Sequence, residues 1–346
     1  MSWISDAAIT RLREAAAWPE MPGERYAIVR GIGRGGMGTV FEARDEWLGR
    51  DVAIKISNAP VPGAGLEARL RQEARVLARL EHPGIVPVHD LGLLGDGRLF
   101  YVMKLVRGET LEQHATTIDG QHARVALVER VAETVAFAHA AGVVHRDLKP
   151  SNVMVGSFGE VLVLDWGVAK LLDGRPSGPA AGPPSAACGA ASPPAERFAP
   201  ATTDPGTRLG TPGFMAPEQA RGDVDAAGPP SDVYALGAIL YWLLTGHVPP
   251  DDQNEARSRL AAVRPSVPKR LRAIAVRCLA REPRDRYQDA AALGADITRY
   301  RAGLAVAALP ETALDRAQRW FATYRTFVLL VAAYLVVRTI IALLGR

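Results

Sequence analysis

Apolar and polar residues alternate along the early part of the chain, whereas apolar residues recur every three or four positions through most of the rest. Alternation with β-branched and aromatic residues is typical of strands, and the longer spacing is typical of helices. The alternating pattern predicts strands that begin at Tyr26 and that cover 39–43, 52–56 and 99–103. From Tyr26 onward the chain therefore has a β-rich part, which a mainly helical part follows.

Helical spacing of apolar residues predicts several long helices. One covers 66–80, and another, over 125–141, has the apolar face expected of the buried central helix of the larger part. His139 lies on that face, and we expect it to be a packed core residue rather than a ligand. Further helices are expected over 231–244 and between 268 and 300. Together these patterns indicate an α+β fold with a small β-rich unit and a larger helical unit.

Residues 1–24 form a separate N-terminal arm in this pattern. Apolar residues at helical spacing predict one amphipathic helix, which Pro19 and Pro22 close. The sequence leaves open whether the arm docks on the body or frays. Because the arm carries acidic residues and has no long apolar core, we do not expect it to be a secretory signal.

The C-terminal part contains a continuous apolar run over 326–344. At about 1.5 Å per residue the run is about 28 Å long, close to the hydrocarbon core of a bilayer. Its one charge, Arg338, lies near the end of the run, where the side chain can reach the interface. We expect a single transmembrane helix, preceded by a juxtamembrane segment over 305–325 whose arginines fit a cytoplasmic flank. The alternative is an interfacial helix, or a helix packed on the soluble domain.

The stretch 173–206 differs in composition from the rest of the chain. Of its 34 residues, 25 are Ala, Pro, Gly or Ser, and so few large apolar groups cannot build a core. We therefore expect this stretch to be disordered. Cys188 within it is expected to be a bystander rather than a redox switch.

The overall composition is that of an ordinary globular protein, with 48% hydrophobic and 23% charged residues. Lys and Arg total 41 against 37 Asp and Glu, which is too balanced to indicate nucleic-acid binding. The two cysteines, Cys188 and Cys278, show no metal-ligand spacing and suggest no disulfide framework. We expect no nucleic-acid partner and a reducing compartment for the main domain.

The candidate chemistry concentrates in the loop 145–152, which lies between two short apolar runs and therefore connects two strands. The loop holds a carboxylate at Asp147, an amine at Lys149 and a carboxamide at Asn152. Phosphoryl transfer from a nucleotide needs these groups as an acceptor for the substrate hydroxyl's proton, a cation near the phosphoryl and an oxygen ligand for Mg²⁺. A charged surface turn is the alternative interpretation.

A glycine-rich turn follows the first strand, and its backbone N–H groups can lie over phosphates without a Cβ in the way. Dinucleotide-binding folds use similar turns, but a helix follows there, whereas here 39–43 predicts another strand. On strand 52–56, the amine of Lys55 faces away from its apolar neighbours and toward a nucleotide. An exposed lysine on a strand is the alternative for Lys55.

Several motifs, in this order along the chain, resemble those of the eukaryotic-type (Hanks-type) serine/threonine protein kinases, in particular their bacterial branch. They are GIGRGGMGTV, VAIK, HRDLKPSN, DWG, GTPGFMAPE and RYQDA. The resemblance covers about 25–304 and implies a bilobal protein-kinase-like fold, with an N-lobe over 25–105 and a C-lobe over 106–304. It also identifies 173–206 as an insert in the activation segment.

The resemblance implies that ATP and Mg²⁺ bind between the lobes. In the family, the residue at Asp147 orients and deprotonates the substrate hydroxyl, the residue at Lys149 neutralises developing charge, and the lysine at Lys55 holds the α- and β-phosphates. The catalytic residues implied are Asp147, Lys149, Lys55, its ion-pair partner Glu73 and the peptide-docking residue Thr211.

The same resemblance assigns the residues that contact the nucleotide and the metal. Asn152 and Asp165 are implied as the Mg²⁺ ligands, since both supply hard oxygen atoms. The nucleotide-binding residues implied are Ile32, Gly33, Arg34, Gly35, Gly36, Met37, Gly38, Thr39, Val40, Ala53, Lys55, Met103 and Leu105.

Structural roles are implied for four further residues. His145 is expected to bond backbone groups, Asp232 to brace the catalytic loop, and Glu218 to form a buried pair with Arg286, in which loss of either partner leaves a buried charge.

Arg146 beside the catalytic aspartate can bind a phosphorylated residue, which predicts control by activation-loop phosphorylation. The expected acceptors are Thr202, Thr203 and Thr207.

These expectations describe an ATP-dependent kinase that acts on serine and threonine of proteins, and on itself in trans or within a homodimer, at the cytoplasmic face of a membrane. It would be cytoplasmic if the apolar run does not insert. One alternative is a pseudokinase scaffold that binds nucleotide and partners, motivated by Lys104, by the insert and by Trp166, where the family usually has Phe. A small-molecule kinase is a second alternative.

Overall fold

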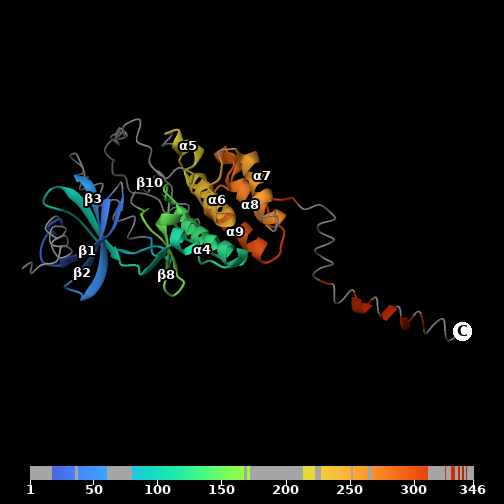
Figure 1. The fold of residues 1–346 in the computed structure, drawn as a ribbon, viewed down its shortest axis with the longest axis horizontal. Coiled ribbons are helices and arrows are strands. Elements are labelled where there is room, and N and C mark those ends of the chain that lie inside the picture. The colour runs from blue at the N-terminus through green and yellow to red at the C-terminus, as the bar shows by residue number, and fades with distance from the viewer. Residues whose placement is uncertain are drawn as a thin grey trace, which may run out of the picture.

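The computed structural model describes residues 18–35, 38–60, 80–166, 170–171, 213–222, 227–250, 252–263 and 267–310, with a few more between 324 and 340. These residues form a strand-rich N-terminal lobe beside a larger helical lobe (Figure 1). The α+β, bilobal architecture expected from the sequence is confirmed.

A five-stranded antiparallel sheet makes the N-terminal lobe, in the order β1-β2-β3-β5-β4. The alternating pattern predicts β1, β2, β3 and β5, and β4 lies at one edge of the sheet. The strands are β1 (Tyr26–Gly35), β2 (Gly38–Asp45), β3 (Arg50–Pro60), β4 (Val88–Leu93) and β5 (Arg98–Lys104).

Alternation on β3 determines which side chains face the core of this lobe. Val52, Ile54 and Ile56 are buried in one apolar cluster, whereas Lys55 between them faces the other side of the strand. Two residues from the end of the N-terminal arm, Trp18 and Met21, pack against the same cluster. The end of the arm therefore docks on the N-lobe, and its first seventeen residues lie outside the described part of the chain.

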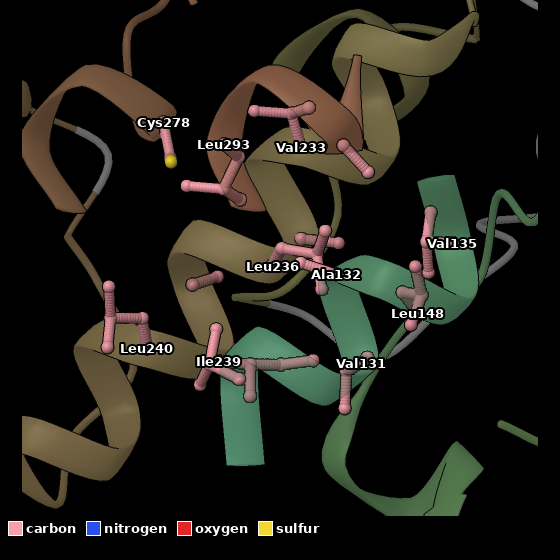
Figure 2. Close-up of a cluster of buried hydrophobic side chains, with 14 of the residues drawn as sticks. Val131, Ala132, Val135, Leu148, Val233, Leu236, Ile239, Leu240, Cys278 and Leu293 are labelled. Carbon is pink, nitrogen blue, oxygen red and sulfur yellow. The ribbon is translucent and has the colours of Figure 1, made fainter. Parts of the chain in front are cut away.

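The helical lobe is built around α4 (Gly120–Ala140) and α6 (Pro229–Thr245). Helices α8 (Lys269–Cys278) and α9 (Ala290–Arg301) pack against them. Figure 2 shows the resulting core, in which apolar side chains from these helices and from the loop 145–152 meet. The labelled members are Val131, Ala132, Val135, Leu148, Val233, Leu236, Ile239, Leu240, Cys278 and Leu293.

Short strands frame the segment between α4 and α6. One small sheet has the order β6-β8-β9, and a second pairs β10 with β7. The remaining short helices are α3 (Leu111–His114), α5 (Pro217–Ala220) and α7 (Gln253–Val263), with 3₁₀ turns at Pro150–Asn152 and Pro283–Asp285. The short strands are β6 (Gly108–Thr110), β7 (Val143–Val144), β8 (Val153–Gly156), β9 (Val161–Val163) and β10 (Lys170–Leu171).

Two elements differ from those that the sequence suggests. The central helix begins at Gly120, five residues earlier than expected. Its first turn is mainly polar, so the spacing of apolar residues does not indicate it. Strand β4 is absent from the strands predicted above, and Ile85, three residues before it, forms an isolated parallel bridge to Val163.

Three expected segments lie wholly or mostly outside the described residues: the helix over 66–80, the insert over 173–206 and the apolar run over 326–344. In the parts of the chain that the structure describes, no helix combines the length and apolar character that crossing a membrane requires.

A buried ion pair joins the start of α5 to the turn before α9. Glu218 accepts two hydrogen bonds from the guanidinium of Arg286, at 2.7 and 2.8 Å, and a third from the Ser231 hydroxyl. Arg286 donates its other N–H groups to three backbone carbonyls. Burial alone would raise the pKa of Glu218, but Arg286 and Ser231 outweigh it and hold the pKa below its ordinary value of 4.5. The expected Glu218–Arg286 pair is confirmed.

Replacing Glu218 with Gln should destabilise the helical lobe by about 3–5 kcal/mol at neutral pH, because Arg286 then stays buried without its counter-charge. The folded-state pKa of Glu218 is lowered. The difference in the free energy of unfolding between wild type and the variant should therefore be complete above about pH 4.5, and it should shrink as the pH falls through the folded-state pKa. Urea unfolding of both proteins between pH 3 and pH 8 measures this difference. A constant difference across that range would contradict the assignment.

Candidate functional site

One buried carboxylate holds the backbone of the loop 145–152, the catalytic loop that the resemblance implies. Asp232, in the first turn of α6, accepts hydrogen bonds from the backbone N–H groups of His145 and Arg146, both at 2.8 Å. Its Oδ2 also accepts from Nε2 of His139 at 2.9 Å, while Nδ1 of that ring accepts from the Ala290 N–H. Asp232 therefore braces the loop as expected, and His139 is the core residue that the sequence predicts.

His145 links the loop to the strand that precedes Asp165. Its Nε2 donates to the carbonyl of Leu164 at 2.8 Å, and its Nδ1 accepts from the backbone N–H of Asp147 at 3.3 Å. These two bonds require the neutral tautomer with the proton on Nε2. The ring therefore forms hydrogen bonds with backbone groups, as expected.

Two side chains form hydrogen bonds with one oxygen of the Asp147 carboxylate. Its Oδ2 accepts from Nζ of Lys149 at 2.8 Å and from Nδ2 of Asn152 at 3.2 Å. The same Asn152 amide donates to the Asp147 carbonyl at 2.8 Å. Both of these side-chain bonds fall on Oδ2.

Lys55 reaches the second acidic residue of the site across the lobes. Its Nζ forms an ion pair with Oδ1 of Asp165, and the hydroxyl of Tyr101 donates to the same oxygen at 3.2 Å. Tyr101 lies opposite Lys55 in the β3–β5 register, which explains their shared partner. The expected partner of Lys55, Glu73, lies outside the described residues.

A backbone hydrogen bond brings the chain beside Asp165 close to Asn152. The N–H of Leu164 donates to the carbonyl of Asn152 at 2.8 Å, which brings the two implied metal ligands to the same end of β9. Asp165 has a φ of 65°, a left-handed conformation that is uncommon for a residue with a side chain. The turn thus directs the carboxylate toward Lys55 rather than along the strand.

The glycine-rich turn joins β1 to β2 as a hairpin, not as a strand-to-helix turn. Gly33, Arg34 and Gly35 pair with Val40, Thr39 and Gly38 respectively. A Cβ on Gly38 would lie 2.4 Å from the carbonyl oxygen of Ile56, so β3 itself requires glycine there. Ile32, before the hairpin, is 41% exposed. Gly36 and Met37, at the tip, lie outside the described residues.

The remaining implied nucleotide contacts line the inner side of the sheet and the hinge. Ala53 is paired with Met103 across β3 and β5, two positions from Lys55 on the same face. Leu105 follows β5 at the connection between the lobes. Ala53 and Met103 therefore share one face of the sheet with Lys55.

Trp166 is buried beneath the catalytic loop. Its indole packs edge-on against the ring of His145, with centroids 4.7 Å apart, and its Nε1–H donates to the carbonyl of Val163 at 3.1 Å. A phenylalanine could make the ring contact but not this hydrogen bond. The larger ring is therefore accommodated within the core cluster and is anchored there.

Besides the Lys55–Asp165 ion pair, two contacts in the site were not expected from the sequence. One is the Tyr101 hydroxyl on Asp165, and the other is a hydrogen bond from Nε2 of Gln219 to the carbonyl of Arg146. The strand register could have indicated Tyr101, but nothing in the pattern around Gln219 indicated its contact. The expected docking residue Thr211 and the expected acceptors Thr202, Thr203 and Thr207 lie outside the described residues.

Comparison with known proteins agrees with this geometry. The family described as "Protein kinase domain" matches residues 26–295. Serine/threonine-protein kinase PknD of Protochlamydia amoebophila is 34% identical over 305 residues, covering 80% of this chain and 30% of the relative. Serine/threonine-protein kinase PrkC of Bacillus subtilis is 34% identical over 287 residues, covering 79% of this chain and 40% of the relative.

A solved structure shares the fold. The crystal structure of the Mycobacterium tuberculosis PknI kinase domain matches with a TM-score of 0.58 and 26% identity, over 81% of this chain and 97% of that one. The chain spans less than half the length of the two curated relatives above. By family match and by relatives, the chain belongs to the protein kinase family, in its bacterial serine/threonine (Hanks-type) branch.

Proposed function

We propose that this chain transfers the γ-phosphate of ATP to serine and threonine hydroxyls of proteins. The observation that carries the proposal is the carboxylate of Asp147, which Lys149 and Asn152 hold at Oδ2. The backbone of the same loop is held by hydrogen bonds to Asp232. Phosphoryl transfer depends mainly on positioning and on electrostatic stabilisation, and this arrangement provides both.

Asp147 would accept the hydrogen bond of the attacking hydroxyl at Oδ1 and take its proton as the phosphoryl moves. Lys149 already donates to Oδ2 and brings a positive charge to the site of transfer. Its ammonium would stabilise negative charge that develops on the transferring phosphoryl oxygens. The two residues therefore divide the roles of base and electrostatic stabiliser.

The donor groups of the site fit ATP with Mg²⁺. Among the described residues, no three His, Cys, Asp or Glu side chains gather into a metal-binding group. Asp165 and Asn152 would instead supply two oxygen ligands, with phosphate oxygens and water as the others, which is the ligand set that Mg²⁺ prefers in nucleotide sites. When bound, the metal neutralises phosphate charge.

The N-lobe residues would bind the nucleotide. Lys55 would exchange part of its pairing with Asp165 for contacts to the α- and β-phosphates. Glu73 would then be the carboxylate that pairs with Lys55. Ala53, Met103 and Leu105 would enclose the adenine. The glycine hairpin would cover the phosphates with backbone N–H groups. The kinase domain over 25–304 would thus be divided at the connection between the lobes.

Regulation and location complete the proposal. Arg146 would bind a phosphorylated threonine of the activation segment, placed there by the kinase itself in trans or within a homodimer. Thr211 would help to dock the peptide hydroxyl. The apolar run over 326–344 would hold the kinase domain at the cytoplasmic face of a membrane.

Replacing Asp147 with Asn should lower phosphate transfer by at least a hundredfold, because an amide cannot accept the hydroxyl proton. The full chain, with labelled ATP, Mg²⁺ and a generic serine/threonine protein substrate, tests this directly. Asp119→Asn is the matched control, since Asp119 is exposed and makes no capping bond. Nucleotide binding by the wild type without any transfer would favour the scaffold alternative.

Replacing Trp166 with Phe should lower the free energy of unfolding by about 1–2 kcal/mol, because the bond to Val163 is lost and the ring is smaller. Phosphate transfer should stay within a few-fold of wild type, since the edge-on contact with His145 remains. Urea unfolding and labelled-ATP assays measure the two effects. A large gain in transfer would mean that the indole restrains the active geometry, contrary to this expectation.

Deleting residues 326–346 should release the chain from the membrane fraction, because the apolar run would supply the anchor. Expression of both forms, followed by washing of the membranes with high salt and then alkaline carbonate, tests this. Release of the full chain by salt alone would favour an interfacial helix, since surface electrostatic attraction is screened.

A further inference from the structure

The segment 213–222 lies against the catalytic loop. A small cavity between them is lined by Arg146, Asp147 and Lys149 on one side and by Phe214, Met215 and Gln219 on the other. Under the proposed function, a substrate peptide would bind along residues 213–222, which we call the docking segment. The contact between the two walls therefore connects the place of docking with the place of chemistry.

One side chain bridges the walls. Gln219 accepts from the backbone N–H of Ala216 at its Oε1, 3.3 Å away, and donates from Nε2 to the carbonyl of Arg146 at 2.8 Å. The first bond stays within the docking segment and fixes the amide plane. The second bond crosses to the catalytic loop and ends on the peptide group that precedes Asp147.

That peptide group controls the orientation of Asp147. The residue before it, Arg146, has a φ of 69°, a left-handed conformation that costs free energy unless its surroundings hold it. Asp232 holds the Arg146 N–H, His145 holds the Asp147 N–H, and Asn152 holds the Asp147 carbonyl. The Arg146 carbonyl is held by Gln219, the one member of this set that comes from the docking segment.

We propose that Gln219 is a positioning residue that couples the docking segment to the catalytic aspartate through the Arg146 carbonyl. The inference rests on the proposed function and deepens it. When the segment is in place, the amide completes the set of backbone partners around Asp147. When the segment moves away, the 146–147 peptide loses one partner and Asp147 loses its fixed orientation.

The chemistry of the amide makes the proposal testable. Gln219→Glu keeps the size and keeps an acceptor for the Ala216 N–H, but a carboxylate cannot donate to a carbonyl. Gln219→Met keeps the volume and removes both bonds. Gln253→Glu is the matched control, because Gln253 also donates its Nε2 to a backbone carbonyl, that of Val276, far from the site.

The experiment uses the full chain and compares wild type with the three variants. Steady-state assays with labelled ATP and a generic serine/threonine protein substrate give kcat and the KM for ATP. Hydrogen–deuterium exchange of the peptide that covers 145–149 reports the catalytic-loop backbone without requiring activity. Thermal unfolding checks that each variant is folded.

Both Gln219 variants should lower kcat about tenfold, leave the KM for ATP within twofold, and speed exchange in 145–149, whereas Gln253→Glu should change none of these. Gln219 variants with wild-type kcat and wild-type exchange would overturn the inference. If wild type transfers no phosphate, the proposed function fails, and exchange alone then decides whether Gln219 holds the loop.

Discussion

The carboxylate of Asp232 is the contact on which the site depends. It is 1% exposed, and burying a charge in this way is costly unless hydrogen bonds replace the lost water. The N–H groups of His145 and Arg146 and the ring of His139 supply three bonds, and the N-terminus of α6 adds a favourable dipole. Since His139 belongs to α4 and is bonded in turn by α9, three helices and the catalytic loop meet at one side chain.

This anchorage allows the site to contain backbone conformations that would be unfavourable in isolation. Arg146 and Asp165 both have positive φ values and both carry side chains, which costs on the order of 1–2 kcal/mol for each. Asp232 and His145 hold the peptide group that precedes Arg146 and the one that precedes Asp165, respectively. These conformations determine how the chain turns just before Asp147 and at Asp165, whose carboxylate pairs with Lys55.

The parts of this arrangement that the sequence predicts are those that follow from periodicity. Alternation along β3 is enough to place Lys55 on the face opposite Ile54, and helical spacing is enough to bury His139. Periodicity gives the face of a residue but not its partner across the fold. The pairing of Lys55 with Asp165, the Tyr101 hydroxyl beside it and the docking of Trp18 depend on tertiary packing, so they became visible only in the structure. The roles of Asp232 and Glu218 were expected only through the family resemblance.

Adjacent residues in the docking segment connect the stability of the lobe with the geometry of the site. Glu218 points inward to Arg286, whose five N–H groups all have acceptors, so the start of α5 is fixed by a pair that cannot shift without leaving a buried charge unpaired. Gln219, the next residue, donates a hydrogen bond to the Arg146 carbonyl. Because one short helical turn carries both contacts, the rigidity of the first is passed to the second. The buried pair, although remote from the chemistry, therefore determines where the amide beside Asp147 can lie.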